Sequence, residues 1–284
     1  MSDSAFDAPH QRTPRRTRRT DIDTERPGLA RTHNMLLGGK DNFAVDRAAA
    51  EVILEHMPQA RLCAQENRAA LTKAVRYLAG TAGIDQFLDL GCGFPTVENT
   101  HELAQRINPH ARVCYVDNDP MVLAHGRALL AVNENTTVVD GDLFHPHELL
   151  DDPQVKSFLD LNRPVALLIC GLLMHCPDHR RPNDRIRVLV DGLATGSHLF
   201  VTSWPDTGEP AQRALAAGYQ RALGNGWLRS EELFAEHWVG LELVPPGLRF
   251  TEQWFPDEPD RPIPSPDELE PHQRIQMAGI GRKI

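Results

Sequence analysis

The chain has 284 residues, of which 41% are hydrophobic, 24% are charged and 6% are aromatic. This composition is typical of a globular protein and leaves room for one large domain or two small ones. The net charge of -9 disfavours a protein that binds nucleic acid through a generally basic surface. The longest apolar run, residues 165–174, is too short to span a bilayer, so it predicts a buried strand and no membrane partner.

Five scattered cysteines contain no C-x-x-C pair, which argues against a disulfide scaffold. The N-terminal stretch has no apolar segment of the kind that a secretory signal needs. Both features predict a reducing, cytoplasmic location. No feature of the sequence predicts an oligomeric state.

Residues 1–26 are rich in Ser, Thr, Pro and Arg and contain few large apolar side chains. Such a segment buries too little surface to offset the entropy of ordering, so we predict a disordered tail. Two readings stay open for it: a basic arm for an anionic surface, or a solubilising leader, which we favour. Residues 27–284 are predicted to form a single domain, with an N-terminal helical lid region over residues 27–83.

Helical and strand-like stretches alternate along this domain. The predicted strands are residues 86–92, 112–119, 136–143, 165–174, 198–204, 241–246 and 276–284. The predicted helices are residues 46–57, 63–83, 96–107 (with Thr96 as N-cap), 120–132, 146–161 (interrupted by Pro153), 183–194, 209–223 and 229–238. This alternation predicts an α/β fold with a mostly parallel sheet covered by helices on both faces.

In an open parallel sheet, ligands bind at the carboxyl ends of the strands. The first predicted strand ends in Asp89, followed by Gly91 and Gly93. Two glycines allow the backbone to turn sharply and to approach a ligand closely. This turn is a weak signal by itself, and it gains weight from the strands that follow.

The next two strand ends carry carboxylates. Asp117 lies 24 residues beyond Gly93, where a carboxylate can hold two ribose hydroxyls. Asp142 can accept a hydrogen bond from an exocyclic amine, and Leu143 can pack against a purine. The three strand ends together predict an adenine nucleoside site. The alternative is that the aspartates only cap the helices that they precede.

Two residues favour S-adenosylmethionine over a dinucleotide. Thr96 stands where a dinucleotide fingerprint has its third glycine. Asp89 suits a cationic ligand better than a pyrophosphate, and S-adenosylmethionine carries a sulfonium, an ammonium and no phosphate. We therefore expect S-adenosylmethionine as the cofactor and regard a nicotinamide-dependent oxidoreductase as a distant alternative.

At this point the sequence resembles a known family. The blocks QFLDLGCGFPT (86–96) and VCYVDNDPMVLAH (113–125) look like the cofactor site of class I, Rossmann-like methyltransferases. The segments HNMLLGGKDNF (33–43), NRAAL (67–71) and the ending AGIGRK resemble, more narrowly, a bacterial family of predicted S-adenosyl methyltransferases, formerly a domain of unknown function. The resemblance covers residues 29–284. It implies a Rossmann-like, seven-stranded, mostly parallel sheet whose last strand is antiparallel.

The resemblance also implies roles for individual positions. Asp89 is implied to lie near the cofactor ammonium. The turn formed by Gly91, Cys92 and Gly93 is implied to run alongside the methionine part of the cofactor. Asp117 is implied to hold the ribose, with the adenine contacted by Asn118, Asp142 and Leu143. Pro95 departs from the broad superfamily, many members of which have glycine at this position.

The segment 33–43 precedes the first long predicted helix and combines two glycines with polar side chains. We interpret it as an ordered lid loop over the cofactor, with Asn34, Gly39 or Lys40 near the cofactor carboxylate. Arg68 is a further candidate for that carboxylate. A structural turn that docks on the sheet is an equally good reading.

The acceptor side is less defined. His175 follows the fourth strand and is our candidate for a catalytic base. A zinc reading of His175, Cys176 and His179 lacks a fourth ligand at a familiar spacing, so we expect no metal. The alternative is that His175 and Cys176 line a loop that has no catalytic role. Trp204 and Tyr219 either shape the acceptor pocket or are core aromatic residues.

Methyl transfer requires in-line approach, a dry pocket and a removable proton, so it needs no nucleophilic side chain. We therefore expect an S-adenosylmethionine-dependent methyltransferase that acts on a small molecule, with no nucleic-acid partner. The alternative is a non-catalytic module that binds S-adenosylmethionine or S-adenosylhomocysteine.

Overall fold

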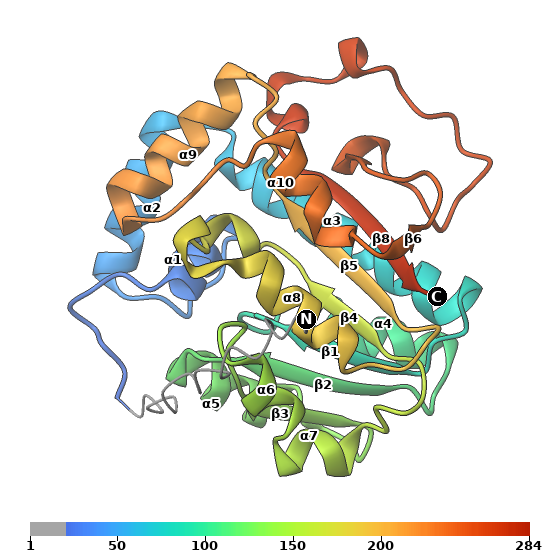
Figure 1. The fold of residues 1–284 in the computed structure, drawn as a ribbon. Helices are drawn as coiled ribbons and strands as arrows, with labels where there is room; N and C mark the ends of the chain where they lie inside the picture. Colours follow the sequence, from blue (N-terminus) through green and yellow to red (C-terminus); the bar gives the residue numbers. More distant parts are fainter. Residues whose placement is uncertain (1–20) are drawn as a thin grey trace, which may run out of the picture.

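The computed structural model describes residues 21–284 and centres on one mixed β-sheet (Figure 1). The strand order is β3-β2-β1-β4-β5-β8-β6, and β7 pairs with β8. The strands are β1 (Gln86–Leu90), β2 (Arg112–Asp117), β3 (Thr136–Asp140), β4 (Ala166–Ile169), β5 (His198–Ser203), β6 (Leu241–Leu243), β7 (Arg249–Phe250) and β8 (Met277–Lys283). Strands β1 to β5 pair in parallel, and β8 is antiparallel to both β5 and β6.

This sheet confirms the predicted α/β fold and its antiparallel last strand. The two-residue strand β7 is additional to the seven strands predicted. The prediction missed β7 because two residues carry too little periodicity to be distinguished from a loop.

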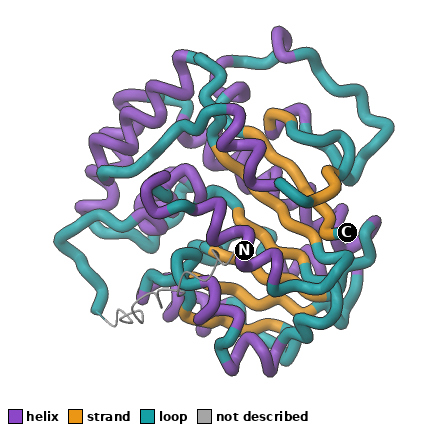
Figure 2. The backbone as a smooth tube through the Cα atoms, viewed as in Figure 1, coloured by secondary structure: helices purple, strands orange, loops and turns teal. Residues whose placement is uncertain are grey.

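Helices cover both faces of the sheet, as predicted (Figures 1 and 2). Alternate strand residues face opposite sides, so Phe87 packs in one core and Leu88 in the other. The first core includes residues of α3 (Ala60–Arg76), α4 (Thr100–Ile107) and α5 (Pro120–Leu129). The second includes residues of α6 (Pro146–Leu150), α7 (Pro153–Phe158), α8 (Pro182–Asp191) and α10 (Glu231–Ala235).

A third core lies beyond the carboxyl ends of the strands. It joins α1 (Leu29–Leu36), α2 (Ala44–His56) and α9 (Pro210–Leu223) to Met174 and Trp204, which follow β4 and β5. Helices α2 and α9 lie side by side in Figure 1. A Cβ on Gly218 would lie 3.1 Å from the Cα of Ile53, so the glycine allows this close approach. The N-terminal helices are thereby held over the end of the sheet where a ligand is expected.

Helix α4 begins later than predicted. Asn99 is its N-cap, and Glu102 returns a side-chain hydrogen bond to the Asn99 backbone N–H (2.7 Å). This reciprocal capping box starts the helix at Thr100, so the expected cap at Thr96 is wrong. The Thr96 hydroxyl instead accepts a hydrogen bond from Arg68 (2.6 Å).

Two other boundaries differ from the sequence prediction. The apolar run 165–174 is a strand only to Ile169, because Gly171 turns the chain with a φ of +67°. Helix α1 was not predicted, and it occupies part of the segment that we had assigned to a loop. Gly38, with a φ of +83°, ends that helix in a left-handed conformation.

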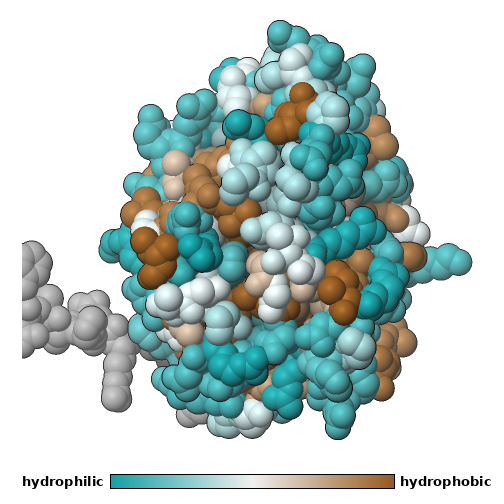
Figure 3. All heavy atoms as spheres, turned by 90° about the vertical axis from the view of Figure 1, so that its right-hand side faces the viewer, coloured by the Kyte–Doolittle hydropathy of each residue, from teal (hydrophilic) through white to brown (hydrophobic). Residues whose placement is uncertain are grey.

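The proline-rich stretch 256–266 lies in a loop between β7 and β8, with short 3-10 helices on either side. On the face drawn in Figure 3, hydrophobic residues occur in small groups among hydrophilic ones. Across residues 21–284, no helix is both long and apolar enough to cross a membrane.

Candidate active site

A cavity of about 800 Å³ lies where the carboxyl ends of β1 to β4 meet α1 and α3. Its volume is within the usual range of roughly 300–1,000 Å³ for small-molecule sites. The strand order reverses between β1 and β4, which is where ligands bind in folds of this type. Most of the predicted site residues line it: Asn34, Arg68, Asp89, Gly91, Cys92, Gly93, Asp117, Asn118, Asp142, Leu143 and His175.

The turn after β1 forms an open cradle. Gly91 and Gly93 have φ values of +74° and +67°, which L-residues with a side chain rarely adopt. No heavy atom of a non-neighbouring residue lies within 4 Å of the position that a Cβ on Gly93 would take. Burial holds the pKa of the Cys92 thiol well above its ordinary value, so this residue is a neutral thiol.

Asp117 ties this turn to the next strand end. Its Oδ2 accepts the Gly93 N–H (3.0 Å), and its Oδ1 accepts the N–H groups of Asn118 (2.7 Å) and Asp119 (3.0 Å). Burial raises the pKa of the carboxyl, and the three backbone donors oppose that shift. A carboxylate offers about four acceptor positions, so Asp117 retains capacity for a ligand hydroxyl.

The third strand end adds a polar pair and an apolar wall. The Asn118 amide donates to Asp142 Oδ2 (3.2 Å), and Asp142 Oδ1 accepts the N–H of Phe144 (2.9 Å). Leu143 is buried beside them, and the Arg180 guanidinium lies 3.4 Å from the centroid of the Phe144 ring. This end therefore combines hydrogen-bonding groups with a flat apolar surface, which suits a purine.

Opposite charges face the same cavity near the β1 turn. Asp89 is 3% exposed and accepts a hydrogen bond from the Thr100 hydroxyl (2.7 Å). Arg68 contacts the neutral oxygens of Thr96 and Glu98. Neither Asp89 nor Arg68 forms a salt bridge with any part of the chain that the structure describes. The pair is complementary to a zwitterionic amino acid.

The Asp89 carboxyl predicts a specific pH dependence. Burial raises its pKa from 3.8 to about 6, so ionisation of Asp89 destabilises the folded protein. The protonated Asp89 carboxyl makes its full contribution to the free energy of unfolding below pH 3.8, and this contribution is lost as the pH rises through 6. We expect Asp89→Asn to increase the free energy of unfolding at pH 8 by up to about 3 kcal/mol, and to have no such effect at pH 4.

Thermal denaturation at both pH values measures this effect. Repeating it with S-adenosylhomocysteine should show a smaller ligand-induced rise in melting temperature for Asp89→Asn than for the wild type. An equal pH dependence of the two proteins would show that Asp89 is not the titrating group.

His175 lies at the far side of the cavity, on the turn after β4. Its Nδ1 is 2.8 Å from Asn225 Oδ1, and its ring packs against Tyr219 (4.9 Å between centroids) and Trp204 (5.7 Å). Burial lowers the pKa of His175 to about 3, so the imidazole is neutral at physiological pH. Trp204 and Tyr219 do not line the cavity; both are buried and contact the His175 ring. Residues 21–284 contain no cluster of three or more potential metal ligands.

The segment 33–43 contributes to the cavity in part only. Asn34 Oδ1 accepts hydrogen bonds from the Asp41 N–H and the Asn42 amide, both at 3.0 Å. A Cβ on Gly39 would overlap the Asn34 side chain, so this glycine makes room for the amide. Gly39 and Lys40 do not line the cavity, and Lys40 is exposed. The structure therefore does not bring these two residues together with the other predicted site residues.

Several cavity residues were not predicted. Leu29 and His33 of α1 and Leu37, its C-cap, are spaced by four residues, and all three line the cavity. Burial lowers the pKa of His33 to about 4, so a second neutral imidazole faces this space. The helical spacing of these three residues was the signal in the sequence that could have identified them. Asn67, next to Arg68 on α3, was also missed.

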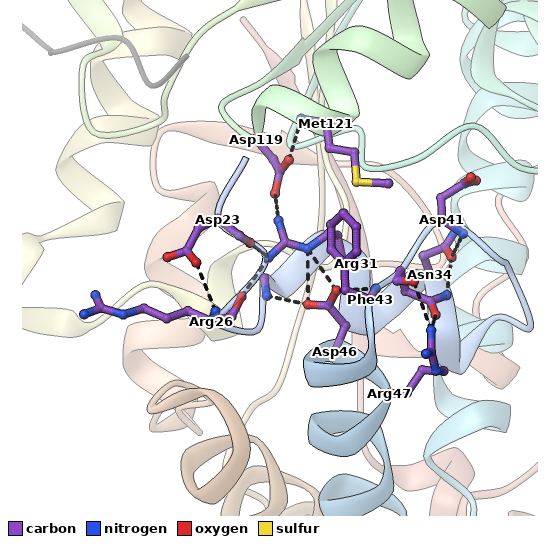
Figure 4. A network of polar contacts seen from close by, with 12 residues as sticks. Asp23, Arg26, Arg31, Asn34, Asp41, Phe43, Asp46, Arg47, Asp119 and Met121 are labelled. Atoms are coloured by element: carbon purple, nitrogen blue, oxygen red, sulfur yellow. Dashed lines mark hydrogen bonds and ion pairs between the residues drawn. The ribbon is translucent and has the colours of Figure 1, made fainter. Parts of the chain in front are cut away.

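Helix α1 covers the cavity and is called its roof below. Arg31 connects this roof to two other elements (Figure 4). Its Nε contacts Asp46 of α2 (3.0 Å), and its Nη1 contacts Asp119 (3.3 Å), which caps α5. Its Nη2 donates to the carbonyl oxygens of Asp23 and Arg26, both at 2.9 Å. Residues 21–26 are exposed but run along the cavity, held there by these two hydrogen bonds, and residues 1–20 of the predicted tail lie outside the described residues.

Comparison with known proteins agrees with this geometry. A family model described as S-adenosyl methyltransferase matches residues 15–284. The chain belongs to this S-adenosyl methyltransferase family. Its cofactor is S-adenosylmethionine, and the family assignment favours an enzyme over a nicotinamide-dependent oxidoreductase or a non-catalytic binding module.

Solved structures support the same family. A candidate methyltransferase from Thermobifida fusca YX is 48% identical, with 91% of this chain and 95% of that chain covered and a TM-score of 0.85. A DUF574 family protein from Streptomyces avermitilis MA-4680 is 33% identical, with 93% and 100% covered and a TM-score of 0.84. Among curated proteins, none matches the sequence.

Proposed function

We propose that this methyltransferase acts on a small molecule that binds between α1 and His175. The observation that carries the proposal is the extension of the cavity beyond the strand ends. There it is lined by Leu29, Leu37 and Leu172 and by the imidazoles of His33 and His175. Helix α1 lies over this part, which favours an acceptor that enters the cavity over one presented on an open surface.

The described residues fit the cofactor by their chemistry. The open cradle at Gly93 leaves space for the methionine part, with Asp89 for its ammonium and Arg68 for its carboxylate. Asp117 would accept a hydrogen bond from a ribose hydroxyl, and Asp142 one from the adenine amine. When bound, S-adenosylmethionine supplies an electrophilic methyl group on a sulfonium. A pyrophosphate at the same position would face the carboxylates of Asp89 and Asp117.

His175 is our candidate for the residue that receives the acceptor proton. If Nδ1 donates to Asn225, Nε2 presents a lone pair for an O–H or N–H of the acceptor. A pKa of about 3 makes His175 a weak base that does not ionise a hydroxyl beforehand. It can accept the proton once methylation makes the acceptor atom strongly acidic. The apolar walls exclude water and favour an acceptor with an uncharged, apolar body.

A panel assay tests this function. The enzyme is incubated with S-adenosylmethionine and either hydroxyl-bearing aromatic and aliphatic small molecules or tRNA and protein, and S-adenosylhomocysteine is quantified. We expect turnover with small molecules, and a loss of about a hundredfold in kcat for His175→Gln with little change in cofactor affinity.

The exposed His179, in the same loop, provides the matched control: His179→Gln should keep the wild-type kcat. Turnover confined to tRNA or protein would overturn the small-molecule assignment. A wild-type rate for His175→Gln would remove this residue from the catalytic proposal.

A further inference from the structure

Asn67 is a buried amide that the assigned cofactor contacts leave unused. It lies on α3, is 6% exposed and lines the cavity. Its Oδ1 accepts a hydrogen bond from the hydroxyl of Thr202 on β5 (2.7 Å). The same hydroxyl oxygen accepts the N–H of Gly171 (2.8 Å). The hydroxyl oxygen lies 2.7 Å from Asn67 Oδ1 and 3.7 Å from Cys170 Sγ, a weaker acceptor, so its hydrogen is directed to the amide oxygen and orients the amide.

The Nδ2 of Asn67 lies against the turn after β4. A Cβ on Gly171 would come 2.5 Å from Nδ2, so only a glycine leaves room for the amide there. Gly171 also has a φ of +67°, and it lines the same cavity as Asn67. Among the described residues, the acceptor offered to Nδ2 is the thiol of Cys170, which is a weak acceptor. Nδ2 carries two hydrogens, so a side chain that is only 6% exposed keeps a donor for which a ligand can supply a stronger acceptor.

We propose that Asn67 is a cofactor-binding residue, whose Nδ2 donates to the carboxylate of the methionine part. Thr202 and Gly171 act as positioning residues, since they orient the amide and leave space for it. The proposal rests on the cofactor placement given under the proposed function. The carboxylate is the matching group because an amide nitrogen only donates, and because Arg68, the next residue of α3, lines the same cavity. The ammonium, itself a donor, is left to Asp89.

The test compares two ligands that differ by the amino-acid part. S-adenosylhomocysteine contains it, whereas 5′-methylthioadenosine retains only the nucleoside and thioether. Calorimetry should show that Asn67→Ala weakens the binding of S-adenosylhomocysteine at least tenfold and leaves the affinity for 5′-methylthioadenosine unchanged. This is the result expected for one lost hydrogen bond to a charged group. Asn67→Asp should weaken it further, because two carboxylates would then face each other.

Variants of Thr202 test whether its hydroxyl orients the Asn67 amide or whether the Thr202 side chain only packs against it. Thr202→Val keeps the side-chain shape and removes the hydroxyl, so we expect a several-fold loss for S-adenosylhomocysteine only. Thr202→Ser, which keeps the hydroxyl, should recover most of that affinity. This pair carries the test if Asn67→Ala fails to fold. Gln65→Ala, on the exposed face of the same helix, is the control for general effects on α3.

The proposal is overturned if Asn67→Ala binds S-adenosylhomocysteine like the wild type, or if both ligands are weakened equally. Equal weakening would make Asn67 a structural residue. A wild-type protein that binds neither ligand would overturn the cofactor placement itself, which separates that failure from a failure of Asn67 alone.

Discussion

Asp117→Ala is expected to weaken the binding of S-adenosylhomocysteine at least tenfold. Three backbone N–H groups already occupy the carboxylate, which leaves room for one charge-assisted hydrogen bond from a ribose hydroxyl, contributing roughly 1.5–3 kcal/mol. Each 1.4 kcal/mol corresponds to a factor of about ten. Because 5′-methylthioadenosine contains the same ribose, its affinity should fall by the same factor, in contrast to the expectation for Asn67→Ala.

Two controls separate this ligand contact from a loss of structure. Asp117 also accepts three backbone N–H groups, so Asp117→Ala must be shown to keep the wild-type circular dichroism and a cooperative melting transition. Asp85→Ala removes a carboxylate just before β1, at the opposite end of the strand from Asp89, and should bind both ligands normally. Normal binding by Asp117→Ala would show that this strand end does not hold the ribose.

The strand-end residues were predictable because their signal is local. A buried strand that runs into two glycines, or that ends in an aspartate, is visible in a few consecutive residues. Parallel pairing then brings these ends together without further information, which places Asp89, Asp117 and Asp142 at one cavity. The structure agrees with this grouping, although Thr96 proved not to be the cap of the following helix.

The residues that were missed depend on contacts between distant parts of the chain. Asn67 and Thr202 are separated by 135 residues, and Arg31 and Asp119 by 88. No periodicity links such pairs, so the amide and the arginine looked like ordinary polar residues. Lys40 is the inverse case: it is a polar residue in a conspicuous motif and was predicted to lie near a ligand, and its side chain is exposed and outside the cavity lining.

Arg31→Ala is expected to release the roof of the cavity from the rest of the protein. Arg31 is 4% exposed and Asp46 is fully buried, so the substitution leaves the Asp46 carboxylate without its cation. Only the backbone N–H groups of Gly28 and Phe43 would remain, both at 2.8 Å. Breaking a buried ion pair in this way costs about 3–5 kcal/mol.

This cost should appear mainly in the docking of residues 21–46, because within the described residues the Arg31 side chain makes its polar contacts with that segment and with Asp119, and none with a strand. Hydrogen exchange should show faster exchange of α1 and of the first turn of α2, with the strands unchanged. The affinity for S-adenosylhomocysteine should fall as well, since Arg31 also contacts Asp119, whose N–H is bound by Asp117. A roof that opens more often also admits water, so kcat should fall.

Arg47→Ala is the matched control, because Arg47 is an exposed arginine of α2 whose side chain, within residues 21–284, forms hydrogen bonds with Asn42 alone. It should change stability by less than about 0.5 kcal/mol. The double variant Arg31→Ala/Asp46→Asn removes the buried charge together with its partner, and it should recover part of the protection lost in Arg31→Ala. Unchanged exchange of α1 in Arg31→Ala would show that the apolar contacts of Leu36 and its neighbours hold the roof without the ion pair. In that case residues 27–83 would be a fixed wall of the site, and not a lid.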